Sequence, residues 1–234
     1  MLEINNLYVN IGNLSIIQDV SLKVGDGEIV ALIGANGMGK TTLVRALSKL
    51  NSIKSGKIFF KGEDITDLSA DKTVEKGIIQ VPEGRKLFPQ MSVIENIEMG
   101  AYAKRARARE KENLEYVFTV FPELKSMLKQ ACGNLSGGQQ QMVAIARSIM
   151  ASPELLILDE PSIGLSPIAT QKMFDAIELI NKSGIGILIT EQNVQQVLKM
   201  ADTAYAMQQG KIALSGKASA IAADEELKKI YIGM

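Results

Sequence analysis

The chain contains no histidine and only one cysteine, Cys132, among its 234 residues. Without an imidazole, no side chain has an unperturbed pKa between about 5 and 8, so mechanisms built on histidine are excluded. A single cysteine excludes an internal disulfide and fits a reducing compartment. We expect Cys132 to pack as a small apolar side chain rather than act as a reactive thiol.

Excess charge is also missing, because 26 basic residues balance 26 acidic ones. The overall charge therefore indicates neither a nucleic-acid partner nor an anionic membrane surface. The densest basic stretch is KRARARE, from Lys104 to Glu110, which is followed by acidic residues and has no interleaved aromatic side chains. This pattern favours a solvated helix face over a nucleic-acid site.

Long apolar runs are lacking as well. None approaches the roughly 18 residues of a membrane-spanning helix, and the first residues, MLEINNLYVN, do not pair a basic region with an apolar one. We therefore expect a cytoplasmic protein without a secretory signal. A hydrophobic content of 46% is sufficient for a buried core.

Short apolar strands alternate with helical patterns, which predicts an α/β fold with a mixed, mainly parallel sheet and an antiparallel N-terminal part. Strands are expected in LEINNLYV, IIQDVSLKV, EIVALIG, KIFF, GIIQV, LLILD, GILIT and AYAMQ. Between residues 88 and 150 the strand signal vanishes and helical patterns dominate. We expect a sheet core formed by residues 1–87 and 151–234, with an inserted helical subdomain over residues 88–150.

The segment GANGMGKT, Gly34 to Thr41, fits the phosphate-loop pattern G-x-x-x-x-G-K-[ST] and lies between a strand and a helix. Its backbone N–H groups are expected to bind phosphate oxygens, Lys40 to reach the β- and γ-phosphates of ATP, and Thr41 to ligate Mg²⁺. The glycine spacing does not fit a dinucleotide-binding loop. The expected nucleotide-binding residues here are Gly34, Ala35, Asn36, Gly37, Met38, Gly39, Lys40, Thr41 and Thr42.

Two adjacent carboxylates, Asp159 and Glu160, end the buried strand LLILD. Beside a phosphate loop, Asp159 is suited to the magnesium shell, and Glu160 to polarising the water that attacks the γ-phosphate. The alternative is that Glu160 is only a solvent-facing strand end.

The pentapeptide LSGGQ precedes a helical run and predicts a second anion-binding helix start. Two such sites in one chain suggest one nucleotide held from two sides. The residues expected to contact it are Ser136, Gly137, Gly138 and Gln139.

A third polar cluster follows the strand GILIT, as Glu191, Gln192 and Asn193. Polar side chains at the carboxyl end of a buried strand lie where α/β sheets bind ligands. Asn193 is also an ordinary N-cap for the next helix. The two interpretations are compatible.

Taken in order, these motifs resemble those of the ATP-binding subunits of ABC transporters over nearly the whole chain. More narrowly, the motifs are similar to those of the smaller of two ATPase subunits of bacterial branched-chain amino-acid importers. The segments that carry this narrower resemblance are VPEGRKLFPQMSVIENIEMGAY, LSGGQQQM, DEPSIGLSP, ITEQN and the final YIGM.

Four positions differ from the broad family pattern. Glu83 replaces the glutamine that most family members carry between the sheet core and the helical subdomain. A carboxylate at this position can still join the magnesium shell through water. Ile11 stands for the aromatic residue that stacks on adenine. Ser166 replaces an aspartate after the paired carboxylates, and Gln192 replaces the histidine that contacts the γ-phosphate. Gln192 can donate a hydrogen bond there but cannot shuttle a proton.

The resemblance implies an Mg-dependent ATPase subunit that dimerises head to tail with an identical or related subunit. Each ATP would be closed over by Ser136, Gly137 and Gly138 of the partner. The dimer would dock on membrane permease subunits at the inner face of the cell membrane, and a solute-binding protein would act indirectly. Two alternatives remain, namely a non-transport ABC ATPase and a regulatory module that holds ATP without hydrolysing it.

Overall fold

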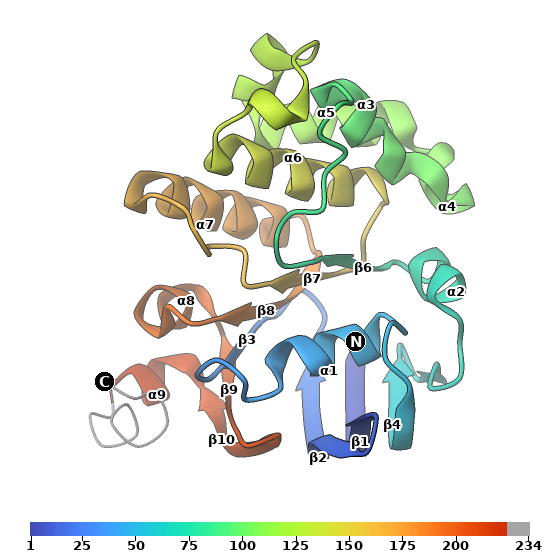
Figure 1. The fold of residues 1–234 in the computed structure, drawn as a ribbon, viewed down its shortest axis with the longest axis vertical. Helices are drawn as coiled ribbons and strands as arrows, with labels where there is room; N and C mark the ends of the chain where they lie inside the picture. Colours follow the sequence, from blue (N-terminus) through green and yellow to red (C-terminus); the bar gives the residue numbers. More distant parts are fainter. Residues whose placement is uncertain (224–234) are drawn as a thin grey trace. The chain divides into compact units, whose positions relative to one another are not determined.

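The computed structural model describes residues 1–223, so the predicted family ending YIGM lies outside the described residues. The chain divides into two compact units (Figure 1). The first unit comprises Met1–Thr73 together with the described residues from Gly186 onward, and the second comprises Val74–Ile185. The helical region expected at residues 88–150 lies within the second unit. Its status as a separate subdomain stays a prediction.

An antiparallel sheet forms the N-terminal part of the first unit. Its strand order is β2-β1-β4-β5. The strands are β1 (Leu2–Ile11), β2 (Leu14–Val24), β4 (Ile53–Phe60) and the two-residue β5 (Glu63–Asp64). Burial alternates along β1, as expected when one face of a strand packs on a core. Helix α1 (Lys40–Leu47) contacts β1 and β2.

A second group of strands in the first unit is mainly parallel. Strand β3 (Ile29–Ile33) pairs in parallel with β8 (Gly186–Glu191) on one side and β9 (Thr203–Gln208) on the other. Strand β10 (Lys211–Lys217) adds antiparallel to β9. Every residue of β3 and β8 is buried, which explains the apolar runs IVALI in β3 and GILI in β8. Two short helices follow in this unit, α8 (Val194–Met200) and α9 (Ala218–Ala223).

The second unit combines a parallel strand pair with a group of helices. The chain enters it within α2 (Ala70–Glu75), and β6 (Ile78–Val81) then pairs with β7 (Leu155–Asp159). Helix α6 packs on α3, α5 and α7, as seen in the upper part of Figure 1. The helices are α3 (Val93–Glu98), α4 (Lys104–Arg107), α5 (Glu110–Val120), α6 (Gly137–Met150) and α7 (Pro167–Lys182).

Several local predictions need correction. Strands β5 and β10 were not predicted, because β5 has only two residues and β10 alternates exposed with half-buried positions instead of forming an apolar run. The helical stretch after residue 92 is broken into α3, a 3₁₀ turn (Met99–Tyr102), α4 and α5. The break falls where Ala101 leaves helical geometry.

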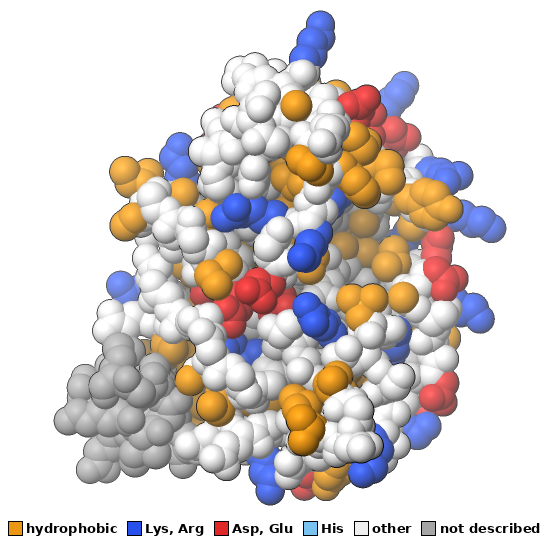
Figure 2. Space-filling view, in the orientation of Figure 1, with side chains coloured by type: hydrophobic (Ala, Val, Ile, Leu, Met, Phe, Trp, Pro, Cys, Tyr) orange, Lys and Arg blue, Asp and Glu red, His pale blue; other side chains and the backbone are white. Residues whose placement is uncertain are grey.

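The basic stretch KRARARE is not one uniformly solvated helix face. The guanidinium of Arg105 donates to Glu154 at 3.1 Å and to the carbonyl of Glu75 at 3.3 Å. Arg109 forms a fork with the carboxylate of Glu112, with donor–acceptor distances of 3.0 and 2.6 Å. Arg107 lies over the ring of Tyr102. Lys and Arg side chains are spread around the face shown in Figure 2 rather than gathered in one patch.

Among residues 1–223, no helix is long and apolar enough to cross a membrane.

Candidate active site

The phosphate loop begins directly after β3, where the chain comes very close to β9. A β-carbon at Gly34 would lie 2.5 Å from the carbonyl oxygen of Met207, and one at Gly39 would lie 2.9 Å from a methyl group of Ile17. At Gly34 the neighbouring atom belongs to the backbone and cannot move aside, so only glycine fits there. Gly37 and Gly39 also have φ of 77° and 104°, values that favour glycine. The predicted glycines are therefore required by the geometry of this loop.

Lys40 is the first residue of α1, and its side chain is 4% exposed. Its ammonium group donates to the carbonyl oxygens of Gly34 at 2.7 Å and Ala35 at 3.1 Å. These contacts fold the lysine back across its own loop. A positive charge is thereby held beside backbone N–H groups at a helix start, an arrangement suited to phosphate.

The turn between β9 and β10 supports the same loop, and the sequence analysis missed it. Gly210 N–H donates to the carbonyl of Met38 at 3.1 Å, while Gln18 N–H donates to the carbonyl of Gly210 at 2.9 Å. Gln209 and Gly210 both have positive φ, 46° and 76°, as in a tight two-residue hairpin. The segment QQGK between two alternating stretches was the signal that could have revealed this hairpin.

Ile11 is the last residue of β1 and is 47% exposed. It pairs with Leu14, the first residue of β2, which is 68% exposed. Ile17 of the same strand touches the phosphate loop at Gly39. The hairpin therefore presents two exposed aliphatic side chains, of which sequence reasoning selected only Ile11.

Gln192 comes to the same sheet edge as the phosphate loop. In the parallel pairing of β3 with β8, Ile33 lies opposite Glu191, so Gly34 and Gln192 each follow directly after paired positions. Gln192 is exposed, and its N–H donates to Oε2 of Glu191 at 3.3 Å. Asn193 caps α8 by accepting from the N–H of Gln196. The predicted capping role of Asn193 is confirmed. Gln192 therefore lies between the end of β8 and the cap of α8.

Three predicted acidic residues lie at or after the ends of strands that finish at the same edge within the second unit. Val81 of β6 lies opposite Leu158 of β7 in a parallel pair, so Glu83 follows the same edge as Asp159 and Glu160. Asp159 is 2% exposed and Glu160 is 7% exposed. Glu160 is therefore not a solvent-facing strand end. Its φ of 47° turns the chain sharply after the strand, and its carbonyl accepts from Ile163 N–H at 3.2 Å.

Ser136 begins α6 with a capping box, also in the second unit. Its hydroxyl accepts from the N–H of Gln139 at 3.4 Å, and its own N–H donates to Oε1 of Gln139 at 2.9 Å. Ser136 is exposed, and Gly137 is half-buried. A β-carbon at Gly138 would lie 2.9 Å from that of Ala169 in α7. Helix packing therefore requires the second glycine of LSGGQ.

Two further side chains in this unit have structural roles. Ser166, which replaces the aspartate usual in the family, caps α7 by accepting from the N–H of Ala169 at 3.3 Å. Cys132 is 1% exposed, and burial raises the pKa of its thiol. The prediction that Cys132 packs as a small apolar residue is therefore confirmed.

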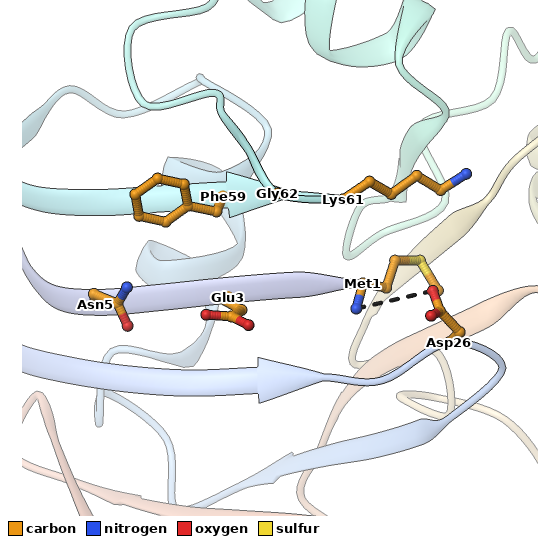
Figure 3. Close-up of a pocket in the computed structure, with 7 residues that line it drawn as sticks. All are labelled: Met1, Glu3, Asn5, Asp26, Phe59, Lys61 and Gly62. Atoms are coloured by element: carbon orange, nitrogen blue, oxygen red, sulfur yellow. Dashed lines mark ion pairs between the residues drawn. The ribbon is translucent and has the colours of Figure 1, made fainter.

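A surface pocket of about 690 Å³ lies elsewhere in the first unit (Figure 3). The N-terminal ammonium group and Asp26 form an ion pair at its edge, 3.9 Å apart. The pocket shares no residue with the predicted nucleotide site. Its lining consists of Met1, Glu3, Asn5, Asp26, Phe59, Lys61 and Gly62.

The predicted magnesium ligands are chemically suitable for a hard cation. Thr41 offers a hydroxyl in the first turn of α1, and Asp159 offers a carboxylate at the end of a buried strand. Oxygen ligands of this kind suit Mg²⁺. Within residues 1–223, no group of three or more His, Cys, Asp or Glu side chains forms a cluster able to hold a metal by itself.

Comparison with known proteins decides the family. The model of the ABC transporter family matches residues 17–163. The chain belongs to the ABC transporter family. The match spans the phosphate loop, the LSGGQ segment and the paired carboxylates, so as an ABC transporter ATPase subunit the chain binds and hydrolyses ATP.

Two relatives and one solved structure that are similar to this ABC subunit illustrate the range of its neighbours. It is 39% identical over 233 residues to the high-affinity branched-chain amino acid transport ATP-binding protein BraG of Pseudomonas aeruginosa, with 100% of both chains covered. It is 34% identical over 238 residues to the lipopolysaccharide export system ATP-binding protein LptB of Haemophilus influenzae, covering 100% of this chain and 97% of that one. The crystal structure of the ADP conformation of an ATP-binding cassette of an ABC transporter has a TM-score of 0.85 and 27% identity, and the match covers 100% of this chain and 99% of that one.

Proposed function

We propose that this ATPase energises a membrane importer of branched-chain or similar amino acids. The main support is the 39% identity to BraG over the full length of both chains. Lipopolysaccharide export is the second candidate, because LptB is 34% identical over nearly its whole length. The segments VPEGR, ITEQN and the final YIGM favour the importer, since they carry the resemblance to the smaller ATPase subunit of such systems.

In the first unit, the proposed nucleotide site uses groups at one sheet edge. Backbone N–H groups from Gly34 to Gly39 and the ammonium group of Lys40 bind the β- and γ-phosphates, and Gln192 donates its amide to the γ-phosphate. Adenine lies against Ile11 rather than stacking on an aromatic ring. The hydroxyl of Thr41 would help to hold Mg²⁺, which would supply positive charge beside the phosphate oxygens.

In the second unit, the proposed chemistry uses the acidic edge. Asp159 would be a direct ligand of Mg²⁺, and Glu83 would act on the ion through water. Glu160 accepts the proton of a water whose oxygen forms a bond to the γ-phosphorus, while the bond from that phosphorus to the β-γ bridging oxygen breaks. Its burial supports this role, because excluding bulk water from the reacting groups strengthens the electrostatic interactions between them.

The working assembly is proposed to be a head-to-tail dimer with an identical or related ABC subunit. Ser136, Gly137, Gly138 and Gln139 of one subunit would close over the ATP of the other. The exposure of Ser136, which caps α6, suits this role. Membrane permease subunits would hold the dimer at the inner face of the cell membrane, with the protein itself on the cytoplasmic side. A solute-binding protein would deliver the amino acid to the permease.

Uptake measurements test the solute class. A strain lacking this gene should lose uptake of labelled leucine, isoleucine and valine, and the parental gene should restore it. Glu160→Gln should not, because the water loses its proton acceptor. Unchanged amino-acid uptake together with a defect in lipopolysaccharide export would contradict the proposal and favour the second candidate. A loss of urea or amide uptake alone would reassign the solute.

A further inference from the structure

The loop after Glu83 adopts an unfavourable backbone conformation over three successive residues. Gly84, Arg85 and Lys86 have φ of 75°, 65° and 46°. Residues with a β-carbon rarely adopt this left-handed region, and two in succession are rarer still. Such a conformation persists only where the surroundings hold it in place. The contacts that hold it here all lie within the second unit.

Helix α6, which begins with the LSGGQ segment, holds this loop from one side. Arg147 of α6 donates from Nη1 to the carbonyl oxygen of Lys86 at 2.9 Å and from Nη2 to that of Arg85 at 3.0 Å. A guanidinium can bind two neighbouring acceptors at once because its donors form a planar fork. The carbonyl groups of Arg85 and Lys86 are thereby held by α6, the helix that Ser136 caps.

The far end of the loop is fixed by a buried amide. Asn96 in α3 is 0% exposed; it accepts from the N–H of Phe88 at 2.9 Å and donates to the carbonyl of Phe88 at 3.0 Å. The loop is thus attached to both α6 and α3, which themselves pack together.

The side chain of Arg85 then connects this loop to two other predicted functional segments. Its Nη1 donates to Oε1 of Gln140 at 3.3 Å, and its Nη2 donates to the carbonyl of Ile163 at 3.5 Å. The amide of Gln140 is oriented by a bond from its Nε2 to the carbonyl of Cys132 at 3.1 Å. A β-carbon at Gly137 would lie 3.2 Å from Nη2 of Arg85.

One guanidinium therefore joins three segments within the second unit. They are the loop that follows Glu83, the start of α6 at LSGGQ, and the turn after Glu160. The side chain of the neighbouring Lys86 differs from that of Arg85, because it is exposed and Arg147 binds only the backbone carbonyl of Lys86.

We propose that Arg85 is a positioning residue that couples the two ATP sites of the dimer. The proposal rests on the shared-site dimer described above. In that dimer, Glu83 and Glu160 act on one ATP, while Ser136 and Gly137 of the same subunit act on the other. A group that fixes these segments to one another makes closure at one site favour closure at the second.

The test measures ATPase rate against ATP concentration in the assembled dimer. The parental protein should show a Hill coefficient above 1. Arg85→Ala should lower this coefficient to about 1, because closure at one site no longer favours closure at the other. It should also reduce kcat, because the segments that carry Glu83 and Glu160 lose their attachment to α6. The ATP dissociation constant of the isolated subunit should change less than about twofold, because Lys40 and its loop are untouched.

Two further variants make the test specific. Lys86→Ala removes a neighbouring positive charge and keeps the carbonyl that Arg147 binds, so it should retain the parental Hill coefficient and kcat. Arg85→Lys keeps the charge but loses the planar fork, so it should lose cooperativity as Arg85→Ala does. Arg85→Lys also decides the outcome should Arg85→Ala fail to fold, which circular dichroism would reveal.

Several results would overturn the proposal. They are a parental Hill coefficient of 1, an Arg85→Ala variant with parental cooperativity and kcat, full cooperativity in Arg85→Lys, or equal loss in Lys86→Ala. Mixing Gly137→Asp with Lys40→Ala subunits tests the shared site separately. If that mixture regains activity while Arg85→Ala stays parental, only the coupling role fails. If no activity returns in mixed dimers shown to form, the shared site itself fails.

Discussion

The strongest prediction compares two serines that cap helices of the second unit in the same way. Ser136 and Ser92 each form a capping box with the residue three positions later. The hydroxyl accepts from the N–H of that residue at 3.4 Å in both cases. Ser92 also donates its hydroxyl to Glu95, so its local contacts are at least as strong. Only Ser136 is proposed to contact a nucleotide.

Replacing either serine with alanine should lower stability by a similar amount. Loss of an N-cap side chain costs about 1 kcal/mol, which for a chain of this size lowers the unfolding midpoint by about 2 to 4 °C. Ser136→Ala should in addition lose a hydrogen bond to a charged phosphate, worth about 1.5 to 3 kcal/mol. This converts to a fall in ATPase rate between about tenfold and about a hundredfold.

Thermal unfolding followed by calorimetry and phosphate release at 25 °C would measure the two effects. Ser92→Ala should share the lower midpoint and keep the parental rate, since both proteins remain folded at that temperature. Equal ATPase rates in Ser136→Ala and Ser92→Ala would refute the reasoning. The hydroxyl of Ser136 would then serve only as a helix cap.

Three other predictions concern Glu160 together with Lys40, Gln192, and the buried Cys132. Glu160→Gln should keep ATP binding and lower turnover by orders of magnitude, and a near-normal rate in this variant would contradict the role of Glu160. Lys40→Ala should weaken ATP binding itself, and an unchanged ATP dissociation constant would contradict the role of Lys40. Gln192→His should add an inflection near pH 6.5 to the profile of ATPase rate against pH, because the parental protein has no histidine to produce one. Gln192→Ala should slow turnover. If neither change is observed, Gln192 does not touch the γ-phosphate. Because burial raises the pKa of the Cys132 thiol, little thiolate forms near pH 7, and iodoacetamide should modify the folded protein far more slowly than free cysteine; fast modification at parental stability would argue against burial.

The sequence alone determined those parts of the site that lie within a few consecutive residues. The strand LLILD was predicted with its observed bounds, Leu155–Asp159. Asn193 was predicted to cap a helix and does so. Such features depend on local chemistry, namely a run of buried apolar residues, a helix start, or a side chain that reaches its own backbone. The phosphate loop belongs to the same class, because its glycines and Lys40 act within one short turn.

Tertiary structure decided the contacts between residues far apart in the chain. Arg147 binds carbonyls 61 and 62 positions away, and the hairpin at Gly210 supports the phosphate loop at Met38. Arg105 is paired with Glu154 although its sequence surroundings suggested a solvated face. These pairings follow from strand register and helix packing, which no local pattern encodes. The motifs therefore identified the chemistry, while packing fixed which side chains hold each motif in place.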